Sequence, residues 1–139
     1  MRQHDLTEST LRAHWVAGAF GLPTAYENQA FSKPDDAPWA ALWYVPADTQ
    51  PVTAGSRGQD EVVGFLQIDL NYPLNKGTGD TRTMADKIAD HFPVGHPLVY
   101  NGFVVKPTYV HRGQGREVDG WWRTPITIGW YSRLNRLGA

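Results

Sequence analysis

Four side chains that could bind a metal ion lie close together in the sequence: Asp86, Asp90, His91 and His96. Residues four apart share one face of a helix, so a carboxylate and an imidazole at that spacing could hold one ion. However, no histidine pair has the HExxH spacing, and the chain has no cysteine that could supply a thiolate. The two aspartates flank Lys87, as expected of the solvent-exposed side of a helix. We therefore predict no metal site.

A glycine-containing segment, NKGTGDT at residues 75–81, lies between a predicted strand and a predicted helix. Backbone amides at such a position often bind phosphate groups. The segment matches neither GxxxxGK[ST] nor a GxGxxG motif in its βαβ context, and Asp80 would repel a phosphate. We interpret it as a capped turn and predict no cofactor.

The chain contains the residue types of a hydrolytic triad, namely four serines (Ser9, Ser32, Ser56 and Ser132), five histidines and many acids. No nucleophile-elbow pattern surrounds any of these serines. We therefore assign no catalytic residue.

Arginines and tryptophans near the C-terminus could stack on and pair with a nucleic acid: Trp121–Arg123, Arg112 and Arg116. Glu117 and Asp119 interrupt this run, and the formal net charge of the whole chain is −1. Aromatic residues and arginine are also enriched in protein interfaces. We interpret the region as a protein interface or the edge of an aromatic core.

Length and composition bound these possibilities. A chain of 139 residues is predicted to form one domain, residues 1–139, and the lack of cysteine excludes disulfide frameworks. We recognise no signal peptide and no apolar stretch of about 18 residues that could span a membrane. The chain has six Trp, six Tyr and five Phe, which indicates an aromatic core or surfaces that contact another protein.

In the first half of the chain, apolar periodicity predicts a helix at 7–20, stopped by Gly21 and Pro23. A strand is predicted at 39–45, ending at Pro46. A polar stretch of residues 47–60 has no periodicity and is predicted to be a long loop. The clearest strand is 62–72, in which apolar and polar residues alternate.

In the second half, a capped helix is predicted at 81–92. A hairpin is predicted at 97–111 around Asn101-Gly102, followed by a polar loop at 112–120 and a strand at 121–131. We expect the tail at 131–137 either to dock or to fray. The fold predicted from this order is α+β, with a mostly antiparallel sheet, two α-helices packed on it and a long β-hairpin loop.

Several segments, read in order, resemble one family: AYENQ with Phe31, residues 39–49, GFLQIDL at 64–70, GTG at 77–79 and MADKI at 84–88. The chain resembles the bacteriophage tail terminator, or tail completion, proteins of long-tailed phages. The resemblance covers residues 24–92 well and the C-terminal strands loosely.

This resemblance implies a structural virion protein and not an enzyme. The implied protein is a homo-oligomeric ring, usually a hexamer, at the head-proximal end of the virion tail, assembled in the host cytoplasm. It would stop polymerisation of the tail tube and join the head, with the tube protein and a head-side connector as partners. Neither membrane binding nor sequence-specific nucleic-acid binding is expected.

Candidate interaction residues follow from the exposure and length of the two polar loops and the tail, together with the arginine and tryptophan residues described above. They are Thr53, Ser56, Arg57, Gln59, Asp60, Arg112, Arg116, Trp121, Trp122, Arg133 and Arg136. Two alternatives stay open. The chain could be a head–tail connector or a tube subunit, or it could be a small-molecule-binding domain or an enzyme that uses His91 and His96.

Overall fold

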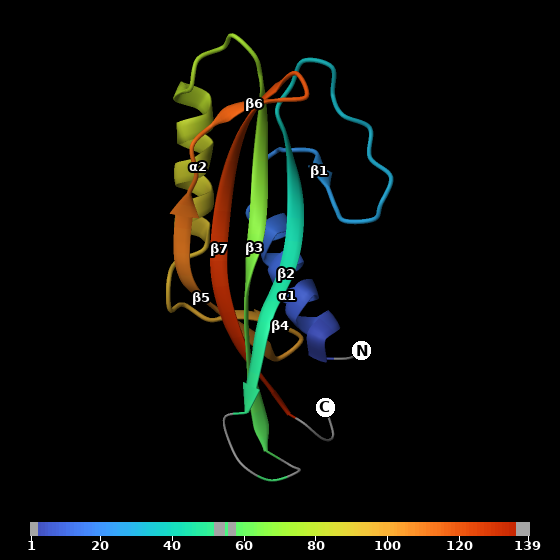
Figure 1. Cartoon of the computed structure of the whole chain (residues 1–139), viewed down its shortest axis with the longest axis vertical. Helices are drawn as coiled ribbons and strands as arrows, with labels where there is room; N and C mark the ends of the chain where they lie inside the picture. The colour runs from blue at the N-terminus through green and yellow to red at the C-terminus, as the bar shows by residue number, and fades with distance from the viewer. Residues whose placement is uncertain (1–2, 52–54, 56–57, 136–139) are drawn as a thin grey trace.

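A computed structural model of the chain describes residues 3–51, 55 and 58–135 (Figure 1). The described residues form two helices and seven strands, so the predicted α+β class is confirmed. In chain order the elements are α1 (Gln3–Ala17), β1 (Thr24–Ala25), β2 (Trp39–Pro51), β3 (Gln59–Pro73), α2 (Gly79–His91), β4 (Leu98–Tyr100), β5 (Phe103–Arg112), β6 (Arg116–Val118) and β7 (Trp121–Asn135).

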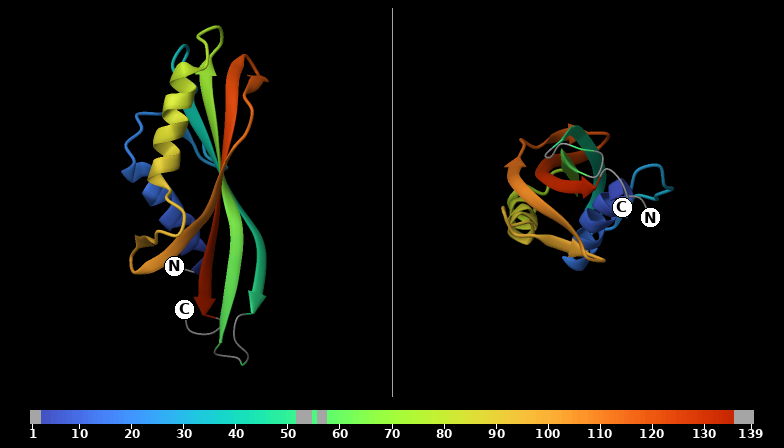
Figure 2. Two further views of the ribbon diagram at one scale, coloured as in Figure 1. Left: turned by 90° about the vertical axis from the view of Figure 1, so that its left-hand side faces the viewer. Right: turned by 90° about the horizontal axis from the view of Figure 1, so that it is seen from below.

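The strands form one curled sheet in the order β1-β2-β3-β7-β5-β4, and β6 pairs with β7 outside this path (Figure 2). β1 pairs with β2 in parallel, whereas the β2–β3, β3–β7, β4–β5, β5–β7 and β6–β7 pairs are antiparallel. The central pair is long, because β3 and β7 remain in register from Gln59–Asn135 to Pro73–Trp121. The sheet therefore presents two margins, one at β1–β2 and the other at β4, β5 and β6.

Both helices pack on one face of this sheet. Alternate residues of β3, such as Leu66, Ile68 and Leu70, are buried on that face. They meet Leu11 and Trp15 of α1, and the buried face of α2, which includes Ala85 and Ile88. The alternation predicted for residues 62–72 thus gives the core-facing side of β3.

The polar stretch 47–60 is not a long loop, and Pro46 does not end its strand. β2 continues to Pro51 and β3 begins at Gln59. A register shift between Pro46 and Asp48 accommodates the first proline. Proline is tolerated here because β1 pairs with β2 only at Ala40 and Ala41, so β2 is an edge strand at Pro46 and loses no ladder hydrogen bond on its free side.

The sheet therefore extends past the helices as a three-stranded arm, made of residues 45–51 of β2, 59–65 of β3 and 130–135 of β7 (Figure 2). Residues 46–51 are all exposed, which explains why their sequence lacks the apolar alternation of a buried strand.

Several predicted boundaries are also wrong. The first helix spans Gln3–Ala17 instead of 7–20, because Gly18 closes it on His14 and Ala19 takes a left-handed φ of 49°. The loop at 112–120 contains β6, and the tail belongs to β7 as far as Asn135. The second helix begins at Gly79, and Thr78 makes no side-chain capping bond.

Candidate functional site

The candidate interaction residues of the arm lie at its far end. Gln59 and Asp60 are half-buried at the start of β3, opposite Asn135 and Leu134 of β7. Arg133 is exposed on β7. Four further candidates lie outside the described residues: Thr53, Ser56, Arg57 and Arg136.

A groove of about 520 Å³ runs beside this end of β7, next to the β4–β5 hairpin. Its lining includes Gln59, Phe103, Lys106 and Arg133. The groove exists because β5 leaves β7 after the Lys106–Tyr131 pair, and Ser132 then bridges the strands by donating its hydroxyl to the Val104 carbonyl at 2.9 Å. Two predicted site residues, Gln59 and Arg133, thus share one hollow.

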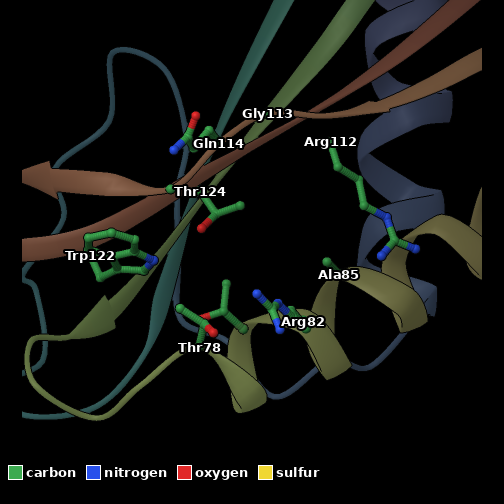
Figure 3. A pocket seen from close by; sticks show the side chains of 10 residues that line it. Thr78, Arg82, Ala85, Arg112, Gly113, Gln114, Trp122 and Thr124 are labelled. Carbon is green, nitrogen blue, oxygen red and sulfur yellow. The ribbon is translucent and has the colours of Figure 1, made fainter.

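A second hollow, of about 460 Å³, lies between α2 and the segment that joins β5 to β6 (Figure 3). It brings together Arg112 and Trp122, which sequence reasoning placed in one interface. Figure 3 shows the indole nitrogen of Trp122 turned toward the space between Thr124 and Thr78. Apolar walls with a few polar groups are typical of pockets that bind another molecule.

Arg112 does not act as a free cation, because its Nη1 donates to Asp86 Oδ1 at 2.6 Å. Both side chains are substantially exposed, so this ion pair contributes little to stability. Asp86, considered above as a metal ligand, is therefore engaged with β5.

A polar cluster on the helix-free face of the sheet was missed by the sequence analysis. Asp69 is only 6% exposed and accepts hydrogen bonds from Trp43 Nε1 at 3.1 Å and Gln67 Nε2 at 2.9 Å. The fully buried Asn71 accepts a hydrogen bond from Arg123 Nε at 2.8 Å. The polar residues at positions 67, 69 and 71 alternate with apolar ones, which predicts that they face solvent. Nothing in the sequence indicates that side chains of neighbouring strands cover them.

Arg116 lines a third hollow, of about 690 Å³, beside this polar cluster. It lies on β6 opposite Arg123 of β7 and is exposed. Trp121, at the start of β7, packs edge-on against Trp39 with ring centroids 5.9 Å apart. Trp121 therefore takes part in packing within the fold, whereas Trp43 on β2 is 46% exposed.

The histidines join the two helices instead of facing Asp86. His14 and His91 stack with ring centroids 3.9 Å apart. His91 Nε2 lies 2.6 Å from the His14 carbonyl, and His14 Nε2 contacts the His91 carbonyl in return. Burial lowers the pKa of His14, as do the nearby charges of His91 and His96, although its bond to His91 partly opposes this shift. Among the described residues, no three metal-ligating side chains form a cluster.

The sequence model of a family described as "Phage tail terminator protein" matches residues 4–130. The chain belongs to this family. The resemblance noted from the sequence is therefore confirmed and extends well beyond residue 92.

A solved structure that carries no functional name shares the fold. It aligns with a TM-score of 0.68 and 22% identity, covering 91% of this chain and 95% of its own. No curated protein matches the chain. The part of the chain that the structure describes has no helix long and apolar enough to cross a membrane.

Membership of the tail terminator family assigns the chain a structural role in tail assembly. The family consists of structural phage tail proteins and is not an enzyme family. Such a role implies contacts with other tail or head proteins. The hollows lined by Arg112, Arg116, Trp122 and Arg133 are candidate places for those contacts.

Proposed function

We propose that the chain forms a homo-oligomeric ring, a hexamer, that caps the head-proximal end of the tail tube. The ring stops tube polymerisation and presents a surface for head joining. The observation that carries this proposal is the family match over residues 4–130. The tail tube protein and a head-side connector are the proposed partners.

The arm supports a role in contacting a neighbouring ring. It projects beyond both helices, and residues 46–51 of its edge strand are exposed (Figure 2). A long, polar, projecting element contributes little to the core and is suited to reach another protein. We propose that the segment of residues 47–60 contacts the tube or an adjacent subunit.

The capping role is tested by assembling tail tubes with and without the protein and measuring tube lengths by electron microscopy. We expect uniform lengths and capped ends only when the protein is present. Equal, unregulated lengths in both samples would refute the proposal. A chain that polymerised by itself into long filaments would instead be a tube subunit.

The arm is tested by deleting residues 53–59. The variant should remain folded, because the core lies elsewhere, but it should fail to cap tubes. Lys87→Ala, on the exposed side of α2, is the surface control and should cap normally. Normal capping by the deletion variant would remove the end of the arm from the mechanism.

A further inference from the structure

We propose that neighbouring subunits of the ring meet through side-chain ion pairs between two oppositely charged sheet margins, without forming a continuous sheet. This inference rests on the ring proposed above and specifies its contact. The occupant of each margin is a second copy of this chain.

Charge is separated between the two margins of the sheet. Residues 22–51, which include β1, the following loop and β2, contain four acidic side chains and one basic side chain. Residues 103–135, which include β5, β6 and β7, contain five basic and two acidic side chains. We call the first set (Glu27, Asp35, Asp36 and Asp48) the acidic margin. We call the second set (Lys106, Arg112, Arg116 and Arg133) the basic margin.

The two margins lie at opposite sides of the molecule. β1 and β2 form one end of the strand order, while β5 and β6 lie on the other side of the central β3–β7 pair (Figure 1). A ring requires two different, mutually complementary patches on each subunit. Opposite charges on opposite margins supply such a pair, because the acidic margin of one copy can face the basic margin of the next.

Backbone donors along the free edge of β2 are blocked. The N–H of Tyr44 donates to the Glu27 carboxylate, and the N–H of Thr49 donates to Asp48 Oδ1 at 2.9 Å. Pro46 and Pro51 have no N–H group. Alternate residues of a strand face its free edge, and the bulge between residues 46 and 48 accounts for the odd step in the series 44, 46, 49 and 51.

A strand from another chain needs both donors and acceptors on the edge that it joins. Beyond the residues paired with β1, the free edge of β2 offers backbone carbonyl acceptors and the carboxylates of Glu27 and Asp48. Its N–H donors at the four positions 44, 46, 49 and 51 are absent or already bonded. Such an edge resists strand addition and attracts cationic side chains. Tyr44 adds no charge there, since burial, and secondarily the charges of Glu8 and Asp5, raise its pKa to about 12.

The basic margin presents cations of the required kind. Arg116 and Arg133 are exposed, and Lys106 is half-buried beside the groove next to β7. Arg116 also lies opposite Arg123, and two like charges at such a position repel each other. A carboxylate from a second copy of the chain would reduce this repulsion. Arg112 is engaged with Asp86 and is the least available of the four.

The test uses charge reversal on each margin. One variant carries Asp35→Lys and Asp36→Lys, and the other carries Lys106→Glu and Arg116→Glu. Counted over residues 22–51, the first variant changes the net charge from −3 to +1, and counted over residues 103–135, the second changes it from +3 to −1. Each variant alone then carries two segments of the same sign, so we expect its fraction of capped tubes to fall at least tenfold. An equimolar mixture should restore capping, because alternating copies again place opposite charges together at every contact.

The control variant carries Lys76→Glu and Lys87→Glu, which makes the same change in net charge as the second variant, at exposed positions that belong to neither margin. It should cap as the unaltered protein does. If the unaltered protein caps tubes but each variant caps equally well, the ion-pair contact is refuted and the capping role stands. Failure of the mixture to restore capping also refutes the contact. If the unaltered protein neither caps tubes nor forms rings, the proposed function itself fails.

Discussion

Gly64→Ala should be destabilising because Gly64 lies where the arm leaves the core. Gly64 on β3 is paired with Pro46 on one side and with Trp130 on the other. A Cβ at this position would lie 2.4 Å from the Val45 carbonyl oxygen, 2.7 Å from Trp130 Cζ2 and 3.0 Å from the Pro46 Cα. Two of these three obstacles are backbone atoms, so relief requires movement of β2 itself.

The magnitude follows from three contributions. Forcing a methyl group into packed surroundings costs about 1–3 kcal/mol, and each β2–β3 hydrogen bond weakened by the movement costs about 1 kcal/mol. Replacing glycine by alanine in a strand returns about 0.5–1 kcal/mol through the entropy of the unfolded chain. We expect a net loss of about 2–3 kcal/mol, which is a fall in Tm of about 6–9 °C for a chain of this size.

Gly129→Ala is the matched control. Its Cβ would lie 1.9 Å from the ring of Tyr109, but that side chain is 47% exposed and can swing into solvent. The substitution should cost about 1 kcal/mol in the native background and should stabilise by about 0.5 kcal/mol when combined with Tyr109→Ala. Urea unfolding of the five proteins measures these differences: the unaltered chain, Gly64→Ala, Gly129→Ala, Tyr109→Ala and the variant that carries both Gly129→Ala and Tyr109→Ala. A Gly64→Ala loss below about 0.5 kcal/mol, or an equal Gly129→Ala loss in both backgrounds, would refute the reasoning.

Three further predictions concern the helices. Since the pKa of His14 is lowered, the folded chain binds a proton there less readily than the unfolded chain does, and the free energy of unfolding should fall as the pH drops below about 6.5. Urea midpoints measured between pH 7.5 and 5.5 should therefore decrease for the unaltered chain and change less for His14→Gln. Phe92→Ala should cost about 3–5 kcal/mol in chemical unfolding, because Phe92, at the C-terminal end of α2, is fully buried in the core; a loss below 1 kcal/mol would contradict its place there. Arg112→Ala should change stability by less than about 1 kcal/mol, because its ion pair with Asp86 is exposed, and a larger loss in thermal unfolding would show an additional role.

The sequence predicted those parts of the fold in which one side of an element is buried. Leu66, Ile68 and Leu70 alternate because α1 and α2 cover one face of β3. The arm was missed because residues 46–51 are exposed on both faces, so no alternation marks them as a strand. These residues form a strand because they pair with β3, and the pattern within residues 46–51 cannot show that pairing.

The candidate site was predictable to a similar extent. Residue type and position in the chain placed Arg116 and Arg133 among the candidates, and both side chains are exposed, but whether they contact a partner stays a prediction. The pairing of Arg112 with Asp86 was not predictable, since it joins residues 26 apart on different elements. The same holds for His14 and His91, which are 77 residues apart and stack only because the two helices meet.

The blocked donors of β2 bear on the free subunit as well as on the ring. A long edge strand outside the core is an aggregation hazard, because any extended chain can pair with it. Prolines at 46 and 51, together with the carboxylates of Glu27 and Asp48, reduce that hazard while keeping the arm extended. The same groups leave negative charge along the edge, so the features that prevent indiscriminate strand pairing also select a cationic partner surface. Specific assembly can then depend on charges that wrong partners lack, while the arm itself remains available to contact the tube.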